Sequence, residues 1–395
     1  MKKILFTAAA ALAIITASAQ TETDSSGFKS RKLKMEEINL VSSYYTQDGN
    51  NAAVTGGIGS EKLTDFANII DIKLTRYDKK LRKQTLTGEL GVDHYTSASS
   101  DMVDLKANSS ASHADLRIYP SVSLSIENEE KGTTFGVGLS SSTEFDYQSF
   151  GGNIMFAKKT KDKNGELTAK FNAFLDQVKL VEPVELRTNG GRGDDYASAA
   201  RNSFAGSLSY SQIINQNLQV ELLADAVQQN GYLSLPFHRV YFQDNSVHQE
   251  NLPDTRFKLP LGFRANYFAG DKVIIKTYYR YYKDDWGLSS HTANLELPVK
   301  VTNFFSISPF YRYYTQTAID YFAPYRTHTA TDKYYTSNYD LSAFNSQFYG
   351  AGLRFAPASG VFGNPHIGML EVRYGHYTRT TNLNSNIVSL NLKFK

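Results

Sequence analysis

Histidines beside carboxylates or hydroxyls are the side chains of this sequence whose types could do chemistry. Asp93 precedes His94 and Ser290 precedes His291, which are partners that a general base or an activated serine needs. In an extended strand, adjacent side chains point to opposite faces, so neither pair could act on one substrate. No nucleophile-elbow motif G-x-S-x-G is present in the sequence. We therefore expect no enzyme and no catalytic residue, and a hydrolase built into a barrel wall is the least favoured alternative.

Metal and cofactor sites have equally weak support. The eight histidines lack the His-x-x-x-His or His-Glu-x-x-His spacing of a helical metal site. His238 and His248 share one segment with Asp244, so weak surface metal binding is an alternative there. The stretch 189–195 contains Arg-Gly-Asp and three glycines, but without a strand before it and a helix after it we interpret it as a loop tip. The chain has no cysteine, which excludes disulfides and cysteine ligands, and we expect no metal and no cofactor.

The first residues have the features of an export signal. Lys2 and Lys3 precede the apolar stretch 4–15, and the small residues 17–19 end at a predicted cleavage between Ala19 and Gln20. We predict a cleaved signal peptide over 1–19, a short polar periplasmic segment over 20–35 and a membrane barrel over 36–395. No later segment approaches the roughly 20 apolar residues of a membrane helix, and a closed barrel is the other structure that can cross a bilayer.

Extended segments with alternating side chains fill the chain from residue 36 onward. Residues 113–126 alternate strictly between apolar and polar side chains, and the last ten residues, 386–395, do the same. A mean hydropathy of −0.39 does not oppose a membrane location, because only every second residue of such a strand meets lipid. The 26 tyrosines and 24 phenylalanines are a rich supply for aromatic girdles. We predict an all-β, up-and-down antiparallel transmembrane barrel of about 16 strands.

The connections between these segments alternate in length. We expect the short ones to be periplasmic turns and the long ones to be extracellular loops, as in outer-membrane barrels. The short connections are 78–83, 127–131, 161–165, 214–216, 270–271 and 302–303. The long connections are 47–64, 97–112, 177–202, 229–256 and 317–345. Of these, we expect 177–202 or 317–345 to be the loop that folds into the barrel.

Four stretches of the sequence resemble one protein family. They are residues 113–120 (HADLRIYP), 127–136 (ENEEKGTTFG), 142–151 (STEFDYQSFG) and 258–268 (KLPLGFRANYF). They are similar to the Gram-negative outer-membrane β-barrel family known as domain of unknown function 3570, and the similarity spans nearly the whole mature chain. The resemblance implies a barrel in the outer membrane. It implies no catalytic or binding residue, although some members hint at envelope redox chemistry.

The polar faces of the predicted strands divide their charges unevenly along the chain. If these faces point inward, sequential strands place acids on one wall and bases on the opposite wall of a lumen. The predicted acidic wall comprises Asp71, Glu89, Asp93, Asp115, Glu221 and Asp225. The predicted basic wall comprises Arg264, Lys276, Arg280, Arg312, Arg354 and Arg373. Opposed charges across water favour polar solutes, so these residues would screen permeants.

A porin-like channel for small polar solutes is the function that these patterns favour. The main alternative is a closed barrel that serves as a scaffold or sheath for surface or periplasmic proteins, including an electron-transfer assembly. The five tyrosines of 317–345 could grip a sugar or a partner protein, or pack within their own loop. The net charge of +3 and the absence of a basic run give no support to nucleic-acid binding. The expected partners are outer-membrane lipid and small polar solutes.

Overall fold

The computed structural model describes residues 29–96, 114–186 and 196–394. The predicted signal peptide with its Ala19–Gln20 cleavage point, most of segment 20–35, the loop 97–112 and the Arg-Gly-Asp stretch lie outside the described residues. Strands dominate the described part of the chain, and its helices are the short 3-10 turns η1 (Ala53–Thr55), η2 (Val184–Leu186) and η3 (Tyr339–Leu341). No helix within this part is long and apolar enough to cross a membrane.

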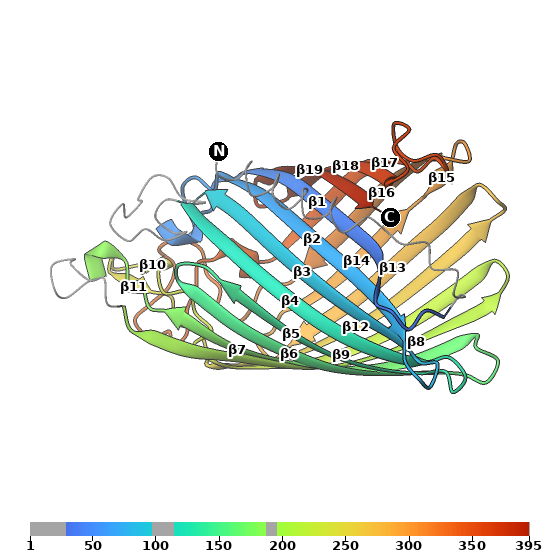
Figure 1. The fold of residues 1–395 in the computed structure, drawn as a ribbon. Coiled ribbons are helices and arrows are strands. Elements are labelled where there is room, and N and C mark those ends of the chain that lie inside the picture. Colours follow the sequence, from blue (N-terminus) through green and yellow to red (C-terminus); the bar gives the residue numbers. More distant parts are fainter. Residues whose placement is uncertain (1–28, 97–113, 187–195, 395) are drawn as a thin grey trace.

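One closed antiparallel sheet forms the body of the molecule (Figure 1). Its strands are β1 (Lys34–Asp48), β2 (Leu63–Tyr77), β3 (Lys83–Thr96), β4 (Ala114–Asn128), β5 (Thr133–Thr143), β6 (Tyr147–Lys159), β7 (Gly165–Lys179), β8 (Ser198–Asn215), β9 (Leu218–Gly231), β12 (Thr255–Ala269), β13 (Val273–Asp284), β14 (Ser289–Glu296), β15 (Val299–Lys300), β16 (Phe305–Gln316), β17 (Phe344–Phe355), β18 (Ile367–Arg379) and β19 (Leu383–Phe394). Both β14 and β15 pair with β13 and β16, so the 17 strands of the sheet occupy sixteen positions around the barrel. The predicted barrel of about 16 strands is confirmed.

The last strand closes the barrel against the first. β1 pairs with β19 from Ile38↔Phe394 to Asp48↔Asn384, and on its other side β1 pairs with β2. Closure matters because an open sheet edge would leave backbone N–H and C=O groups without partners in lipid. The alternating residues at the C-terminal end therefore have a structural role that the sequence pattern predicted.

The two ends of the barrel differ in their connections. The short-turn end carries the connections 78–82, 129–132, 160–164, 216–217, 270–272, 301–304 and 356–366. Its opposite, the loop end, carries the long connections 49–62, 180–197, 232–254 and 317–343, together with the three short ones 144–146, 285–288 and 380–382. The predicted alternation of short and long connections is confirmed, and Figure 1 shows hairpins at one end and irregular loops at the other.

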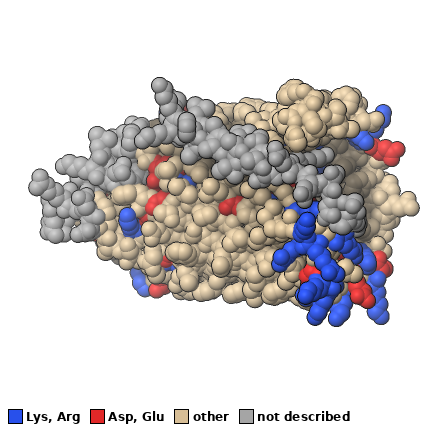
Figure 2. Space-filling model, viewed as in Figure 1, with Lys and Arg blue, Asp and Glu red and all other residues tan. Residues whose placement is uncertain are grey.

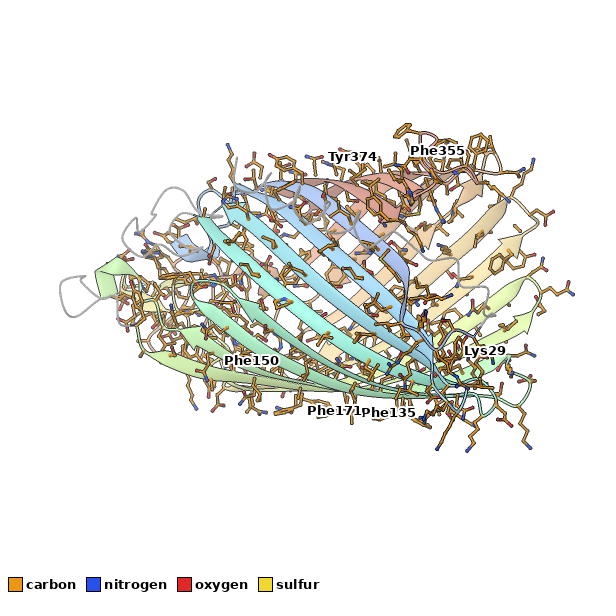
Figure 3. All side chains as sticks on the ribbon, in the orientation of Figure 1. Lys29, Phe135, Phe150, Phe171, Phe355 and Tyr374 are labelled. Carbon is orange, nitrogen blue, oxygen red and sulfur yellow. The ribbon has the colours of Figure 1, made fainter. Side chains whose placement is uncertain are left out.

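Apolar side chains cover the outer face of the barrel wall. Phe150 is 70% exposed, and Phe135 and Phe171 point outward further along the wall toward the short-turn end (Figure 3). The surface along the strands in Figure 2 carries few charges, and Lys and Arg gather at the short-turn end. A water-soluble protein rarely exposes so continuous an apolar surface, whereas a bilayer covers such a band. The molecule is therefore a transmembrane barrel.

Candidate functional site

The polar face of each strand is the inner face of the barrel. Arg373 on β18 lies 3.4 Å from Glu296 on β14, although β16 and β17 separate these two strands in the sheet. Side chains can span two intervening strands only across the concave side of a closed sheet. The charged residues of the same alternation therefore line the lumen, while the apolar residues face outward.

Two predicted acids of β9 pair with predicted bases, one on the adjacent strand β12 and one on β13, the strand beyond it. Glu221 on β9 binds Arg264 on β12 at 2.7 Å, and Asp225 on β9 lies 4.0 Å from Arg280 on β13. This arrangement differs from the expected one, in which all six acids face the bases across the lumen. The reason is the connectivity: β9 is the last strand of the acidic half of the chain and β12 is its direct neighbour. The two sets of charges meet at this boundary.

The other four predicted acids lie on β2, β3 and β4, and none forms an ion pair with another described residue. Asp71 accepts a hydrogen bond from Asn39 at 3.2 Å, and Asp93 accepts one from the Tyr119 hydroxyl at 2.8 Å. Glu89 lines a recess of about 380 Å³ together with Arg117. Seven strand positions separate β3 from β13 in each direction around the barrel, so these acids lie on the wall opposite Lys276 and Arg280.

The remaining predicted bases lie on β16, β17 and β18. Arg312 has its guanidinium 5.8 Å from the centre of the Phe348 ring, and Arg373 is held by Glu371 at 3.1 Å as well as by Glu296. Arg354 lies on β17 near the short-turn end and faces Ser306 in the register. Arg312 and Arg373 share a recess of about 250 Å³ that aromatic rings also line. Glu296, the partner of Arg373, lines the same recess, so Arg312 is its base without a carboxylate partner among the described residues.

Loops from opposite sides of the barrel meet across its loop end. We call the described parts of four of them, together with one short turn, the loop cap: residues 49–62, 180–186, 232–254, 285–288 and 317–343. Arg239 donates a hydrogen bond of 2.8 Å to the carbonyl of Val54, and it also binds Glu185. Six strand positions lie between loop 49–62 and loop 232–254 in each direction around the barrel. A bond between them must therefore cross the mouth.

The loop cap has a core of its own. Leu252, Trp286, Leu288 and Ile319 are buried together, and Tyr321 packs its ring 6.0 Å from that of Trp286. The small sheet of β10 (Arg239–Tyr241) and β11 (Val247–Gln249) lies in the same cap. Isolated bridges tie this region to loop 317–343. The sequence alone did not show this core.

The tyrosines of 317–345 pack within the loop cap, which is one of the two roles considered for them. Tyr325 contacts Tyr241 with tilted rings whose centres are 4.9 Å apart, and Tyr335 meets Phe242 edge to face at 4.9 Å. Such aromatic contacts rigidify loops because each ring buries a large area at little entropic cost. We expected either 177–202 or 317–345 to fold into the barrel. In the structure, several loops, 317–343 among them, contact one another at the mouth.

The loop cap contains a buried carboxylate, that of Glu250. Glu250 accepts hydrogen bonds from the Leu235 amide at 2.7 Å and the Thr336 hydroxyl at 2.5 Å, and it lies 3.4 Å from His238. Burial alone would raise the pKa of Glu250, but the charge of His238 and these hydrogen bonds together lower it below its ordinary value. His248, the other histidine considered for surface metal binding, instead stacks on Phe242.

In each of the two sequence pairs considered for catalysis, Asp93–His94 and Ser290–His291, the two side chains lie on opposite faces of the barrel wall. Asp93 is on the inner face with Tyr119, whereas His94 is exposed on the outer alternation of β3. His291 accepts or donates a hydrogen bond of 2.7 Å with Tyr279, an outward-facing residue, while Ser290 is buried on the opposite side of β14. Neither pair brings its two side chains to one substrate.

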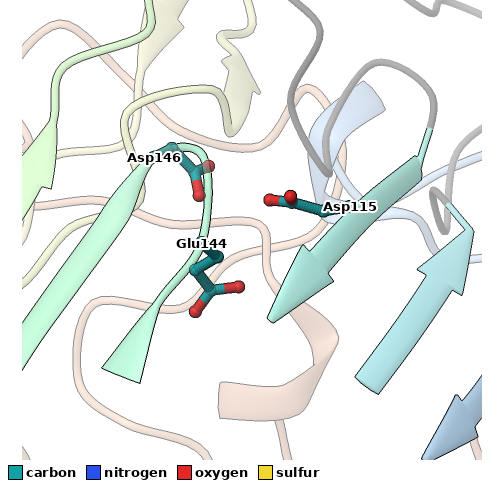
Figure 4. A group of neighbouring side chains, drawn as sticks. All are labelled: Asp115, Glu144 and Asp146. Atoms are coloured by element: carbon teal, nitrogen blue, oxygen red, sulfur yellow. The ribbon is translucent and has the colours of Figure 1, made fainter. Parts of the chain in front are cut away.

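A further group of acids lies at the loop end. Sequence reasoning placed one member, Asp115, in the acidic wall and missed the other two. Asp115, Glu144 and Asp146 bring carboxylate oxygens within 4.8 Å of one another, and we call them the acidic trio (Figure 4). Burial, followed by the charges of Glu144 and Asp115, raises the pKa of Asp146 to about 6. The spacing Glu144-x-Asp146 in a tight turn was a signal in the sequence, but Asp115 lies at the start of β4, the strand before this hairpin.

Comparisons with known proteins give a family and a set of distant structural likenesses. A family model described as "Protein of unknown function (DUF3570)" matches residues 5–384. A BenF-like porin from Pseudomonas fluorescens Pf-5 is similar with 10% identity and a TM-score of 0.44, over 93% of this chain and 100% of that one. Pseudomonas aeruginosa OccK2 (OpdF) in complex with glucuronate gives 9% identity, a TM-score of 0.43 and coverages of 93% and 99%. The siderophore receptor PirA from Acinetobacter baumannii gives 12% identity and a TM-score of 0.44, over 87% of this chain and 53% of that one. No curated protein matches the sequence.

Proposed function

We propose that this chain, which belongs to the DUF3570 family, is a porin-like channel of the Gram-negative outer membrane for small polar solutes. The observation that carries the proposal is the exposure of the inner charges. Within ion pairs, the side chains of Arg264 and Arg280 are still 48% and 42% exposed. A lumen packed solid with ion pairs would bury such groups, so this exposure supports a water-filled interior. In the proposed orientation of the barrel in the membrane, the short turns face the periplasm and the loop end faces the outside of the cell.

The proposed selectivity comes from a transverse electric field. Glu89 and Asp93 on β3 have no ionic partner within the described part of the chain, and they lie opposite Lys276 and Arg280 on β13. Charges of opposite sign across a low-dielectric wall orient water and polar solutes between them. A zwitterion or a solute with separated donors and acceptors gains more from this field than an apolar one. Cofactor or catalytic chemistry has no part in this proposal.

The aromatic and basic recess would favour anionic solutes among the polar ones. Arg312 lies there without a carboxylate partner among the described residues, beside the rings of Phe310 and Phe348. A guanidinium binds a carboxylate through two parallel hydrogen bonds, and an aromatic face accepts the apolar side of a sugar ring. We therefore propose small carboxylated solutes as the preferred permeants.

The loop cap supports one alternative function. Because Arg239 and Val54 join loops across the mouth, the cap could close the barrel, which then would act as a scaffold or sheath for a surface or periplasmic protein. Detergent extraction from native membrane separates the two functions. A stoichiometric partner that stays bound to the barrel would favour the scaffold.

Solute flux into vesicles tests the channel directly. The refolded protein is placed in liposomes, and swelling is followed in iso-osmotic solutions of a neutral monosaccharide, a sugar acid and an amino sugar. We expect swelling well above that of protein-free vesicles, with the sugar acid entering several-fold faster than the amino sugar. Vesicles that contain folded, heat-modifiable barrel and do not swell in any of the three would overturn the proposal.

A further inference from the structure

The acidic trio brings together three carboxylates from two parts of the chain. Asp115 is the second residue of β4, and Glu144 and Asp146 lie in the turn between β5 and β6. Figure 4 shows their carboxylates gathered around one space. Three negative charges at this separation repel one another, so the arrangement costs free energy unless a cation lies among them.

Asp146 is the residue that points to a ligand. It is 7% exposed, and among the described residues no donor other than its own amide forms a hydrogen bond with its carboxylate. A buried carboxylate is normally satisfied by several donors or by a cation. Lys179 attracts Asp146 at a distance, but its ammonium lies 4.5 Å above the Phe145 ring and forms no ion pair with the acid.

The other two carboxylates are held in place from outside. The Phe145 amide donates a hydrogen bond of 3.2 Å to Asp115, and the Tyr95 hydroxyl donates one to Glu144. The second oxygen of Asp115 accepts a hydrogen bond of 2.7 Å from the Leu116 amide, whereas the Tyr95 contact uses one oxygen of Glu144. A carboxylate oxygen that accepts one hydrogen bond keeps a further lone pair for a cation. The hydrogen bonds thus orient two ligands around the space that Asp146 also enters, as outer partners do in metal sites.

We propose that the acidic trio binds one Ca²⁺ ion at the loop end of the barrel. The ligands are all carboxylate oxygens, which suit a hard cation and not zinc or copper. Oxygens on opposite sides of Ca²⁺ are about 5 Å apart, whereas those around Mg²⁺ are about 4 Å apart. The oxygens of the trio lie within 4.8 Å of one another, a spacing that fits either ion. Ca²⁺ is favoured because it accepts irregular oxygen geometry, whereas Mg²⁺ requires a near-ideal octahedron and usually keeps several waters.

The bound ion would join β4 to the β5–β6 turn. Asp115 belongs to one strand of the barrel rim, and the other two ligands belong to the turn of the adjacent hairpin. Water would complete the six to eight oxygen ligands that Ca²⁺ takes. With three protein carboxylates and a rim position, we expect a dissociation constant of about 10⁻⁴ to 10⁻³ M, as in extracellular Ca²⁺ modules. This inference holds whether or not the barrel conducts.

Terbium luminescence tests the site in the full-length folded barrel. Tb³⁺ replaces Ca²⁺ at oxygen sites, and Tyr95, which binds Glu144, would sensitise its emission. We expect saturable emission that Ca²⁺ displaces at lower concentration than Mg²⁺. Asp146→Asn and Glu144→Gln should each weaken Tb³⁺ binding by at least about tenfold, which corresponds to about 1.4 kcal/mol.

Asp244→Asn is the matched control, because Asp244 is an exposed loop-end acid that already accepts a hydrogen bond of 2.9 Å from the Ser246 amide. Its titration should equal that of the wild type. Heat-modifiable migration checks that each variant folds, and the second trio variant serves if one does not. The proposal is overturned by an absence of saturable emission in the wild type, or by trio variants that titrate like the control.

Discussion

The loop cap and the lumen hold their charges in different ways. In the cap, Arg239 and Glu250 are almost fully buried, and each has several polar partners. In the lumen, Arg264 and Arg280 keep nearly half of their side-chain surface exposed, and Asp71, Glu89 and Asp93 have no ionic partner among the described residues. A charge removed from water needs a partner, while a charge that still meets water does not. The comparison teaches that the cap is a packed structure, and it supports the proposal that the lumen is filled with water.

Removal of a buried charge from the cap should have the largest effect. Arg239→Ala deletes the bonds to Val54 and Glu185 that hold three loops together. Glu185 is 36% exposed and can be solvated by water, so the cost comes mainly from the lost hydrogen bond to the Val54 carbonyl and is about 1–3 kcal/mol. Loop 49–62 should therefore exchange its amide hydrogens faster. Hydrogen exchange with mass spectrometry measures this change. Lys333→Ala, an exposed cap residue that lies over Tyr334, is the control and should leave the exchange unaltered.

Acid should loosen the cap through Glu250. The pKa of this carboxyl is lowered below its ordinary value of 4.5, so its stabilising contribution is fully present above that pH and is lost as the pH falls through the folded-state pKa. The groups that face it are His238, Thr336 and, at longer range, Tyr232, whose pKa is raised to about 12 and which stays neutral. Exchange of loop 317–343 should therefore accelerate below about pH 4.5.

A conservative variant checks the assignment of this acid effect. Glu250→Gln keeps the shape of the side chain but cannot titrate, so it should lose most of the pH dependence while exchanging faster at neutral pH. An unchanged acid profile in this variant would assign the effect to another group.

Replacement of a charged lumen residue by an uncharged one should change the stability of the barrel little and its ion selectivity measurably. Arg264→Gln breaks an exposed ion pair with Glu221, which contributes at most about 1 kcal/mol to the free energy of unfolding. Loss of one positive charge from the lumen should make the channel more selective for cations, which shifts its reversal potential toward the equilibrium potential of the cation. Lys272→Gln, in the turn between β12 and β13, changes the same charge outside the strands and should shift the potential less. Equal shifts in the two variants would assign no special role to the lumen position.

The barrel wall was predictable because its signal is local. Period-two alternation over β4 and β19 and the alternation of short and long connections are visible in consecutive residues. The cap was not predictable, since Arg239 and Val54 are 185 residues apart and their contact depends on how the closed sheet places two loops. The pairing of Glu221 with Arg264 depends on register across β9 and β12, which charge counting along the chain does not provide.

The central claim, a wet lumen whose charges select ions beneath a structured cap, is tested most directly by single-channel recording in planar bilayers. The wild type and Arg280→Glu with Arg312→Glu are compared in a salt gradient, because both positions lie on the inner face and neither belongs to the cap. We predict a steady conductance for both proteins and a reversal potential that moves toward the cation in the variant. A correctly folded, heat-modifiable barrel that does not conduct, or a variant with the reversal potential of the wild type, would contradict the account.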